Sequence, residues 1–181
     1  MPARAVVVVD LQNEYWPDGG FALENIEAAA ANAARVIDHA RQTGDLVVHV
    51  RHEMPEGAPV FAPGSKGAEI HATVAPANDE PVVTKHFPNS FRDTGLKELL
   101  DEAGIAEVVV IGAMSHMCVD ATVRAANDFG YRTVTVHDAC ATRDLEFGGI
   151  AAPAAHVHAA MMWSFGFYYG EVISTEDFLA R

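Results

Sequence analysis

The fold of this chain is decided by one strand-to-helix transition, in Glu107-Val-Val-Val-Ile-Gly112 and the following Ala113-Met-Ser-His-Met-Cys118-Val-Asp-Ala-Thr-Val-Arg-Ala-Ala126. The first piece is a short β-branched run, which is typical of a strand buried inside a parallel sheet. The second piece changes to helical spacing. Cys118 therefore lies where a helix begins, at the positive end of the helix dipole, and this position favours the thiolate that attacks carbonyl carbon.

Two further apolar strands end in a charged residue. The run Val6-Val-Val-Val ends at Asp10, and Val82-Val-Thr ends at Lys85. Sites in open parallel sheets are built at the carboxyl ends of the strands, so we expect Asp10, Lys85 and Cys118 to meet there. Taken singly, each has a commoner interpretation: a free cysteine is usually a small buried apolar residue, an aspartate caps a turn, and a lysine is solvated.

Strand and helix signals alternate along the chain. This alternation predicts an α/β fold, a doubly wound parallel sheet with helices on both faces. A length of 181 residues suits a single domain, residues 1–181, with one buried core. Strands are expected at Arg4–Val9, Leu46–Val50, Pro81–Thr84, Val108–Ile111, Thr133–Val136 and Val172–Ile173, and helices at Ile26–Gln42, Thr94–Ala103, Val119–Phe129 and from Pro153 to about Trp163.

One long segment interrupts the alternation. From Glu53 to Glu80 the chain is rich in Pro, Gly and Ala and has no clear period. So long a loop in a compact domain is usually functional or lid-like, and we expect it to help select the ligand.

Composition excludes several classes of partner. The formal net charge is -13 and the pI is about 4.9, which argues against nucleic acid and anionic membrane surfaces. No transmembrane span or signal peptide is readable. The two cysteines, Cys118 and Cys140, lie on different expected elements, so a disulfide is not expected and the compartment is predicted to be reducing and cytoplasmic.

Three segments, in this order, resemble the isochorismatase-like cysteine hydrolase family. They are Val9-Asp10-Leu11-Gln12-Asn13, Thr84-Lys85-His86-Phe87-Pro88-Asn89-Ser90-Phe91 and Gly112-Ala-Met-Ser-His-Met-Cys118-Val119. The flanking Ala121-Thr-Val-Arg-Ala-Ala126 and Asp138-Ala139 are also similar to it. Each motif alone is weak, but their combination is specific, and the resemblance covers roughly Val6 to Ile173.

The resemblance implies six parallel strands ordered 3-2-1-4-5-6 and a Cys-Asp-Lys triad. Cys118 would be the nucleophile, Asp10 the general base and acid, and Lys85 the third member. It also implies a cis peptide bond at Ala113–Met114, which would bring the backbone N–H groups of Met114 and Cys118 together as an oxyanion hole. Family members that cleave the vinyl ether of isochorismate lack a nucleophile at this position, so Cys118 points to the branch that hydrolyses C–N bonds.

The family also divides on metal. Nicotinamidases of this family carry an Asp-x-His and a further His near the second strand. This chain has His49-Val-Arg51-His52-Glu53 there, with His71 later and no Asp-x-His. We therefore expect no metal and no cofactor, with a zinc site built from His49, His52 and His71 as the alternative.

Several residues beside the triad segments are candidates for a small, mostly apolar substrate pocket. Cys140 is expected in the core. The apolar segment Ala151–Trp163 is either a buried helix or a subunit interface, and relatives are commonly oligomeric, so a homo-oligomer, a dimer or tetramer, is expected. The pocket candidates are Tyr15, Trp16, His52, Phe87, Phe91, His116 and Met117.

The sequence thus predicts a metal-independent cysteine hydrolase. It would cleave the C–N bond of a small amide, ureido or carbamoyl compound through a thioester. The alternatives are a zinc-assisted, nicotinamidase-like amidase and a non-catalytic ligand-binding α/β domain. A receiver-type domain would need a phospho-acceptor Asp on the third strand, and a nucleotide-binding domain a glycine-rich turn after the first; neither is present.

Overall fold

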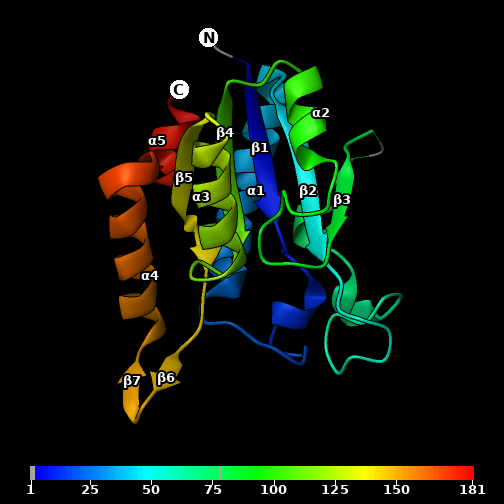
Figure 1. The fold of residues 1–181 in the computed structure, drawn as a ribbon, viewed down its shortest axis with the longest axis vertical. Helices are drawn as coiled ribbons and strands as arrows, with labels where there is room; N and C mark the ends of the chain where they lie inside the picture. Colours follow the sequence, from blue (N-terminus) through cyan, green and yellow to red (C-terminus); the bar gives the residue numbers. More distant parts are fainter. Residues whose placement is uncertain (1–2, 78) are drawn as a thin grey trace.

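The computed structural model describes residues 3–77 and 79–181. A central sheet runs through the molecule, with helices on both faces (Figure 1). Its six strands are all parallel and lie in the order β3-β2-β1-β4-β5-β8. These strands are β1 (Arg4–Val9), β2 (Leu46–His52), β3 (Val82–Lys85), β4 (Glu107–Ala113), β5 (Arg132–Ala141) and β8 (Glu171–Ile173).

The predicted strand order is confirmed. The label β8 belongs to the sixth parallel strand because two short strands, β6 (Leu145–Phe147) and β7 (Ile150–Ala152), come before it and form a separate antiparallel hairpin. The sequence did not predict this hairpin. Its residues are mostly exposed, so it lacks the alternation of buried and exposed side chains by which strands are recognised.

The two faces of the sheet are covered by different helices. α1 (Ile26–Thr43) and α5 (Thr175–Leu179) pack on one face, and α2 (Leu96–Glu102) and α3 (Cys118–Asp128) on the other (Figure 1). Val6 and Val8 of β1 join the core under α1, while Val7 joins the core under α2 and α3. A strand buried on both faces needs apolar residues at every position, which is why β1 has no polar alternation.

Gly112, near the end of β4, is the glycine that the site most depends on. Its φ is 129°, and a side chain there would collide with the carbonyl oxygen of Val9 in β1. The register between β4 and β5 also shifts between Val110 and Gly112. This irregularity bends the chain out of the sheet directly before the segment that carries Cys118.

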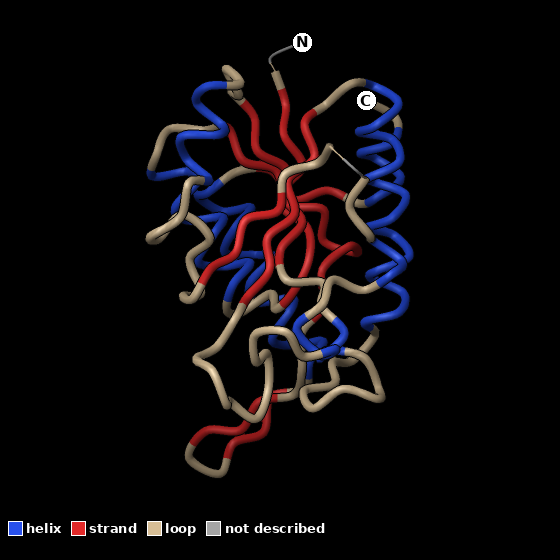
Figure 2. Tube along the Cα trace, turned by 90° about the vertical axis from the view of Figure 1, so that its right-hand side faces the viewer, coloured by secondary structure: helices blue, strands red, loops and turns tan. Residues whose placement is uncertain are grey.

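The irregular segments gather beyond the carboxyl ends of the strands (Figure 2). The segment after β1 contains one turn of 3-10 helix, η1 (Asn13–Tyr15), and the predicted long loop contains two, η2 (Lys66–Ala68) and η3 (Ala72–Val74). The β6–β7 hairpin projects past them and leads into α4 (Ala154–Ser164), which continues as a π-helix, η4 (Phe165–Tyr169). None of the helices in residues 3–77 and 79–181 is both long and apolar enough to cross a membrane.

Candidate active site

The structure brings Asp10, Lys85 and Cys118 together at the carboxyl edge of the sheet. Asp10 follows β1, Lys85 is the last residue of β3, and Cys118 is the first residue of α3, after β4. Lys85 Nζ lies 2.7 Å from Asp10 Oδ2 and 3.3 Å from Cys118 Sγ. Lys85 and Asp10 have no solvent exposure, and Cys118 is 7% exposed. The ammonium therefore sits between the carboxylate and the thiol.

The backbone of Asp10 is unusual. Its φ is 51°, in the left-handed region that a non-glycine residue seldom adopts. The Asp10 N–H donates to the carbonyl of Val50 in β2, and the Gln12 N–H donates back to the Asp10 carbonyl. These bonds turn the chain sharply after β1 and hold the carboxylate under the sheet edge.

His52 completes the surroundings of Lys85. The two residues pair in register across β2 and β3, and Lys85 Nζ is 3.3 Å from His52 Nδ1. An ammonium has three N–H donors, so Asp10, Cys118 and His52 provide one acceptor for each. Burial, helped by the charge of Lys85, lowers the pKa of His52 to about 4. The ring is thus neutral at pH 7, with Nδ1 accepting from Lys85 and Nε2 carrying the proton.

Burial works against a free thiolate in this site. It raises the pKa of the Cys118 thiol, the Asp10 carboxylate raises it further, and the Lys85 ammonium only partly opposes them. Burial also raises the pKa of Asp10. Burial and the Asp10 carboxylate therefore oppose the thiolate that the position at the start of the helix was expected to favour. These shifts favour the protonated thiol, with the Asp10 carboxylate beside it.

The carboxylate of Asp10 has few partners. Apart from Lys85 and Cys118, neither of its oxygens has a hydrogen-bond partner in the described part of the chain. Within residues 3–77 and 79–181 no backbone N–H donates to this carboxylate, so its pKa is set by burial, then by Lys85, with a smaller effect of Cys118.

Two backbone N–H groups are free beside the thiol. The peptide bond between Ala113 and Met114 is cis. Met117 and Val119 both donate to the carbonyl of Met114, and Ser115 donates to that of Ala141. Within residues 3–77 and 79–181, by contrast, neither Met114 N–H nor Cys118 N–H has a protein acceptor. Unpaired donors next to a nucleophile are suited to hold an oxyanion.

A cavity of about 320 Å³ includes Cys118 in its lining. Its walls are mainly aromatic, aliphatic and thioether side chains, and the imidazoles of His52 and His86 are its nitrogen-bearing groups. The lining residues are Tyr15, Phe21, His52, Met54, Val60, Phe61, His86, Pro88, Met114, Met117 and Cys118.

Three of the seven predicted pocket residues, Tyr15, His52 and Met117, lie in this lining. The structure places the other four elsewhere, because each has a different partner. Trp16 stacks on His71, Phe87 lies under the guanidinium of Arg92, Phe91 packs against Phe129, and His116 Nδ1 lies 2.6 Å from Thr142 Oγ1.

Two buried polar residues that sequence reasoning did not select hold the cavity walls. Gln12 bonds through its side chain to both the N–H and the carbonyl of His52 and to the carbonyl of Ala68, each at 2.8 Å. Glu14 accepts from the N–H of Gly20 at 2.7 Å. Gln12 lies in the quoted motif after the first strand, which was the available signal. Its partners are up to 56 residues away along the chain, so spacing could not show its role.

The three histidines of the alternative zinc site do not converge. His49 Nε2 lies 3.0 Å from a Glu80 oxygen, His52 faces Lys85, and His71 stacks on Trp16. The described residues contain no cluster of three or more His, Cys, Asp or Glu suited to a metal ion.

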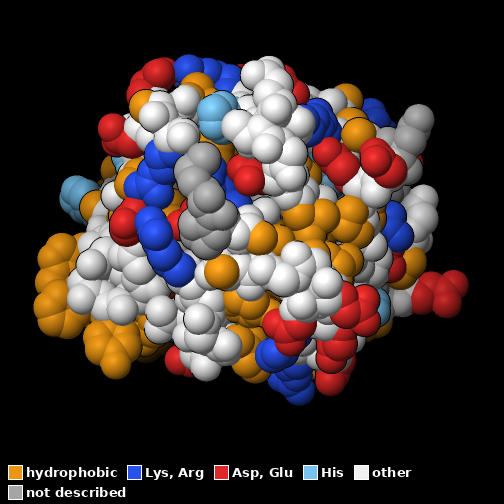
Figure 3. Space-filling model, turned by 90° about the horizontal axis from the view of Figure 1, so that it is seen from above, with side chains coloured by type: hydrophobic (Ala, Val, Ile, Leu, Met, Phe, Trp, Pro, Cys, Tyr) orange, Lys and Arg blue, Asp and Glu red, His pale blue; other side chains and the backbone are white. Residues whose placement is uncertain are grey.

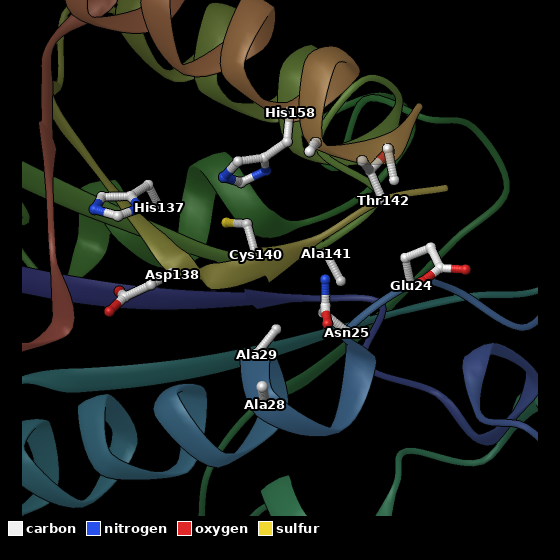
Figure 4. A pocket seen from close by; sticks show the side chains of 12 residues that line it. Glu24, Asn25, Ala28, Ala29, His137, Asp138, Cys140, Ala141, Thr142 and His158 are labelled. Carbon is white, nitrogen blue, oxygen red and sulfur yellow. The ribbon is translucent and has the colours of Figure 1, made fainter. Parts of the chain in front are cut away.

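A second cavity, of about 330 Å³, lies between α1, β5 and α4 (Figure 4). Cys140, His137 and His158 line it, and none of the triad residues does. Cys140 was expected in the core; it is 7% exposed and belongs to the core under α2 and α3, and it also lines this cavity. The two thiols thus belong to different sites.

The chain matches the Isochorismatase domain over residues 4–177. It belongs to the isochorismatase family. An isochorismatase family protein of Bacillus subtilis (strain 168), YddQ, is 49% identical over 177 residues, covering 97% of this chain and 98% of that protein. The streptothricin hydrolase of Streptomyces noursei is 40% identical over 173 residues, covering 90% of this chain and 59% of that protein.

A solved structure of an isochorismatase hydrolase supports this family assignment. It comes from Oleispira antarctica and superposes with a TM-score of 0.97 at 49% identity, covering 99% of this chain and 97% of that one. The family includes amidohydrolases that act on C–N bonds, among them enzymes named for maleamate and ureidoacrylate. The predicted family and enzyme class are thereby confirmed.

Proposed function

We propose that this chain is a cysteine hydrolase that cleaves the C–N bond of a small amide, ureido or carbamoyl compound through a thioester, without a metal. The observation that carries the proposal is the position of the Lys85 ammonium, 2.7 Å from Asp10 and 3.3 Å from the Cys118 thiol. Nucleophile, base and cation are then within reach of one substrate carbon. Named C–N hydrolases among the relatives support the reaction class.

The first half-reaction forms the thioester. Asp10 takes the thiol proton as Cys118 Sγ attacks the substrate carbonyl carbon. The carbonyl oxygen becomes an oxyanion and accepts from the free N–H groups of Met114 and Cys118. When the tetrahedral intermediate collapses, the C–N bond breaks and Asp10 gives its proton to the departing nitrogen. Ammonia or an amine leaves, and the acyl group stays on sulfur.

The second half-reaction hydrolyses the thioester and regenerates the free enzyme. Water attacks the thioester carbon, and Asp10 removes one of its protons. The C–S bond breaks, Asp10 protonates the departing sulfur, and the carboxylic acid is released. Lys85 keeps its charge throughout, which holds Asp10 in place and offsets the negative charge that moves between carboxylate and sulfur.

The test is a panel of small primary amides, ureas and N-carbamoyl compounds, scored for ammonia release. We expect at least one to be hydrolysed, Cys118→Ala to abolish the hydrolysis, and Cys140→Ala, the matched control in the second cavity, to retain it. Activity is also expected to survive prolonged EDTA. Loss of activity on chelation with recovery on adding zinc would favour the nicotinamidase-like alternative, and the absence of any hydrolysis would favour a binding domain.

A further inference from the structure

We infer that the compound cleaved here is uncharged and carries a compact apolar acyl group, a branched aliphatic chain or a single ring, in place of a carboxylate or an ammonium. This inference rests on the proposed function and concerns the chemistry of the same cavity. The observation behind it is the set of side chains that line the cavity of about 320 Å³ next to Cys118.

The part of the cavity lining that the structure describes has no permanently charged side chain to pair with a charged substrate. Among the described residues, no Lys, Arg, Asp or Glu side chain belongs to its lining. Lys85 lies beside Cys118 with no solvent exposure, and its charge is matched by Asp10 at 2.7 Å. Arg143 stacks on the ring of Phe21, 4.4 Å from its centroid, but it is not a lining residue. A carboxylate would therefore lose its hydrating water without gaining a cation, which weakens its binding.

The walls are shaped for an apolar group. The rings of Tyr15 and Phe61 meet edge to face with centroids 5.1 Å apart, and Phe21 lies against Tyr15 at 6.3 Å. Met54 and Met117 add flexible thioether side chains, which adapt to irregular apolar shapes. A space of about 320 Å³ is near the lower limit for ligand sites, so it suits a compact molecule.

The two imidazoles can bind neutral polar atoms. His52 uses Nδ1 to accept from Lys85, so its Nε2–H is the donor it has left, and Met54 Sδ, a weak acceptor, lies 3.2 Å from it. His86 Nδ1 lies 2.8 Å from the carbonyl of Glu53 and must donate to it, which leaves Nε2 as an acceptor in the neutral ring. One donor and one acceptor fit an amide or hydroxyl better than an ion.

The experiment compares two amides of nearly equal shape. In 4-methylpentanamide an isopropyl group stands where succinamate has its carboxylate. We expect kcat/KM for the neutral amide to exceed that for the anion by at least about 100-fold. Equal values, or a preference for succinamate, would overturn the inference while leaving the thioester mechanism intact, because both results require hydrolysis.

A substitution at the mouth of the cavity sharpens the test. Met54 is 38% exposed, so Met54→Lys can place an ammonium in the lining without disturbing the core. We expect it to raise succinamate turnover relative to 4-methylpentanamide by about threefold or more, as a partly exposed ion pair does. Met54→Gln, similar in size and uncharged, is the control for the loss of the thioether and should change the ratio less than Met54→Lys does. An unchanged ratio in Met54→Lys would contradict the inference.

If neither amide is hydrolysed, binding measurements test the preference for a neutral compound instead. Titration calorimetry on Cys118→Ala with each amide measures recognition without chemistry. Tighter binding of 4-methylpentanamide supports the inference, and tighter or equal binding of succinamate overturns it. The failure of the proposed function would be seen separately, as the absence of ammonia release from every compound in the wider panel.

Discussion

Asp10 has two opposed effects on the thiol, and they separate its electrostatic role from its role as base. Its carboxylate raises the pKa of Cys118, yet in the proposed mechanism it is the group that receives the thiol proton. Asp10→Asn keeps the shape but removes both effects. We expect the thiol pKa to fall, since only the Lys85 cation then acts on it, while kcat falls by about 10²–10⁴-fold. Ultraviolet titration of the thiolate and steady-state kinetics measure the two quantities.

Near-normal turnover in Asp10→Asn would remove Asp10 from the chemistry. A thiol pKa that rises in this variant would instead show that the carboxylate is not the charge that opposes the thiolate. Cys140→Ala provides the background for the titration, because it leaves Cys118 as the single free thiol.

His52 is expected to act as a positioning residue through Lys85. His52→Leu leaves one N–H of a buried ammonium unpaired, which should cost about 1–3 kcal/mol in unfolding free energy and lower kcat by about tenfold or more. His52→Asn should recover much of both losses, because its Oδ1 can accept where Nδ1 did. Chemical denaturation measures the unfolding free energy of each variant, and steady-state kinetics at a single pH measure its kcat. If Asn is as impaired as Leu, the bond to Lys85 is not what His52 provides.

At the scale of single residues, the sequence could predict that Asp10, Lys85 and Cys118 lie together, and it could not predict their neighbours. Asp10, Lys85 and Cys118 each end an apolar strand or begin the helix after it, so the rule for parallel sheets places them together. His52 joins them through the register of β2 against β3, which no local pattern encodes. Trp16 lies one residue from Tyr15 yet points away from the cavity, because an irregular segment has no period from which direction can be read.

At the scale of elements, the cavity depends on two irregular segments fastened to the sheet by buried polar side chains. The end of the long loop is held by Glu80, whose carboxylate binds Arg41 of α1 at 2.8 Å and His49 of β2 at 3.0 Å. The sequence predicted the extent of this loop from its composition. It could not predict the anchors, because Glu80 and Arg41 are 39 residues apart.

The Glu80 anchor gives a prediction about acid stability. The pKa of Glu80 is lowered from 4.5 to about 2, chiefly by Arg41. Because the folded state holds the ionised form, this stabilisation is complete above pH 4.5 and is lost as the pH falls toward 2. In Glu80→Gln we expect a smaller loss of unfolding free energy across this window, by about 1 kcal/mol, since Arg41 is partly exposed and solvent screens the pair.

Urea denaturation at a series of pH values measures this difference. Glu176→Gln is the matched control, because Glu176 pairs with Arg35 on the exposed surface. The control should keep the wild-type acid dependence. An unchanged dependence in Glu80→Gln would show that the end of the loop is not held by this ion pair.

At the scale of the whole molecule, one side carries unpartnered apolar side chains. Trp163 and Phe167 stack with centroids 4.9 Å apart and are 68% and 71% exposed. Phe147 and Ile150 of the hairpin are also largely exposed. Seen from above, hydrophobic side chains project at the left of the molecule, the side on which α4 lies in Figure 1 (Figure 3). The sequence left Ala151–Trp163 open between buried helix and interface, and the exposure of Trp163 favours the interface.

We propose that a second copy of this chain covers α4 and the hairpin, because α4 carries apolar side chains on most of its circumference and such a helix is normally buried. Sedimentation analysis should find a dimer or tetramer, and Trp163→Glu should shift it toward the monomer. Val82→Glu, at an exposed position on the opposite edge strand, is the control and should not. A wild-type protein that is monomeric at every concentration would contradict this.

The central claim is that Cys118 carries the acyl group during turnover. The most direct measurement is mass spectrometry of enzyme quenched in acid while it hydrolyses a slowly cleaved amide, followed by digestion to locate the added mass. The account predicts one acyl group, on the peptide containing Cys118, with Cys140 unmodified and no adduct in Cys118→Ala. Hydrolysis that continues in Cys118→Ala, or acylation found on any other residue, would contradict it.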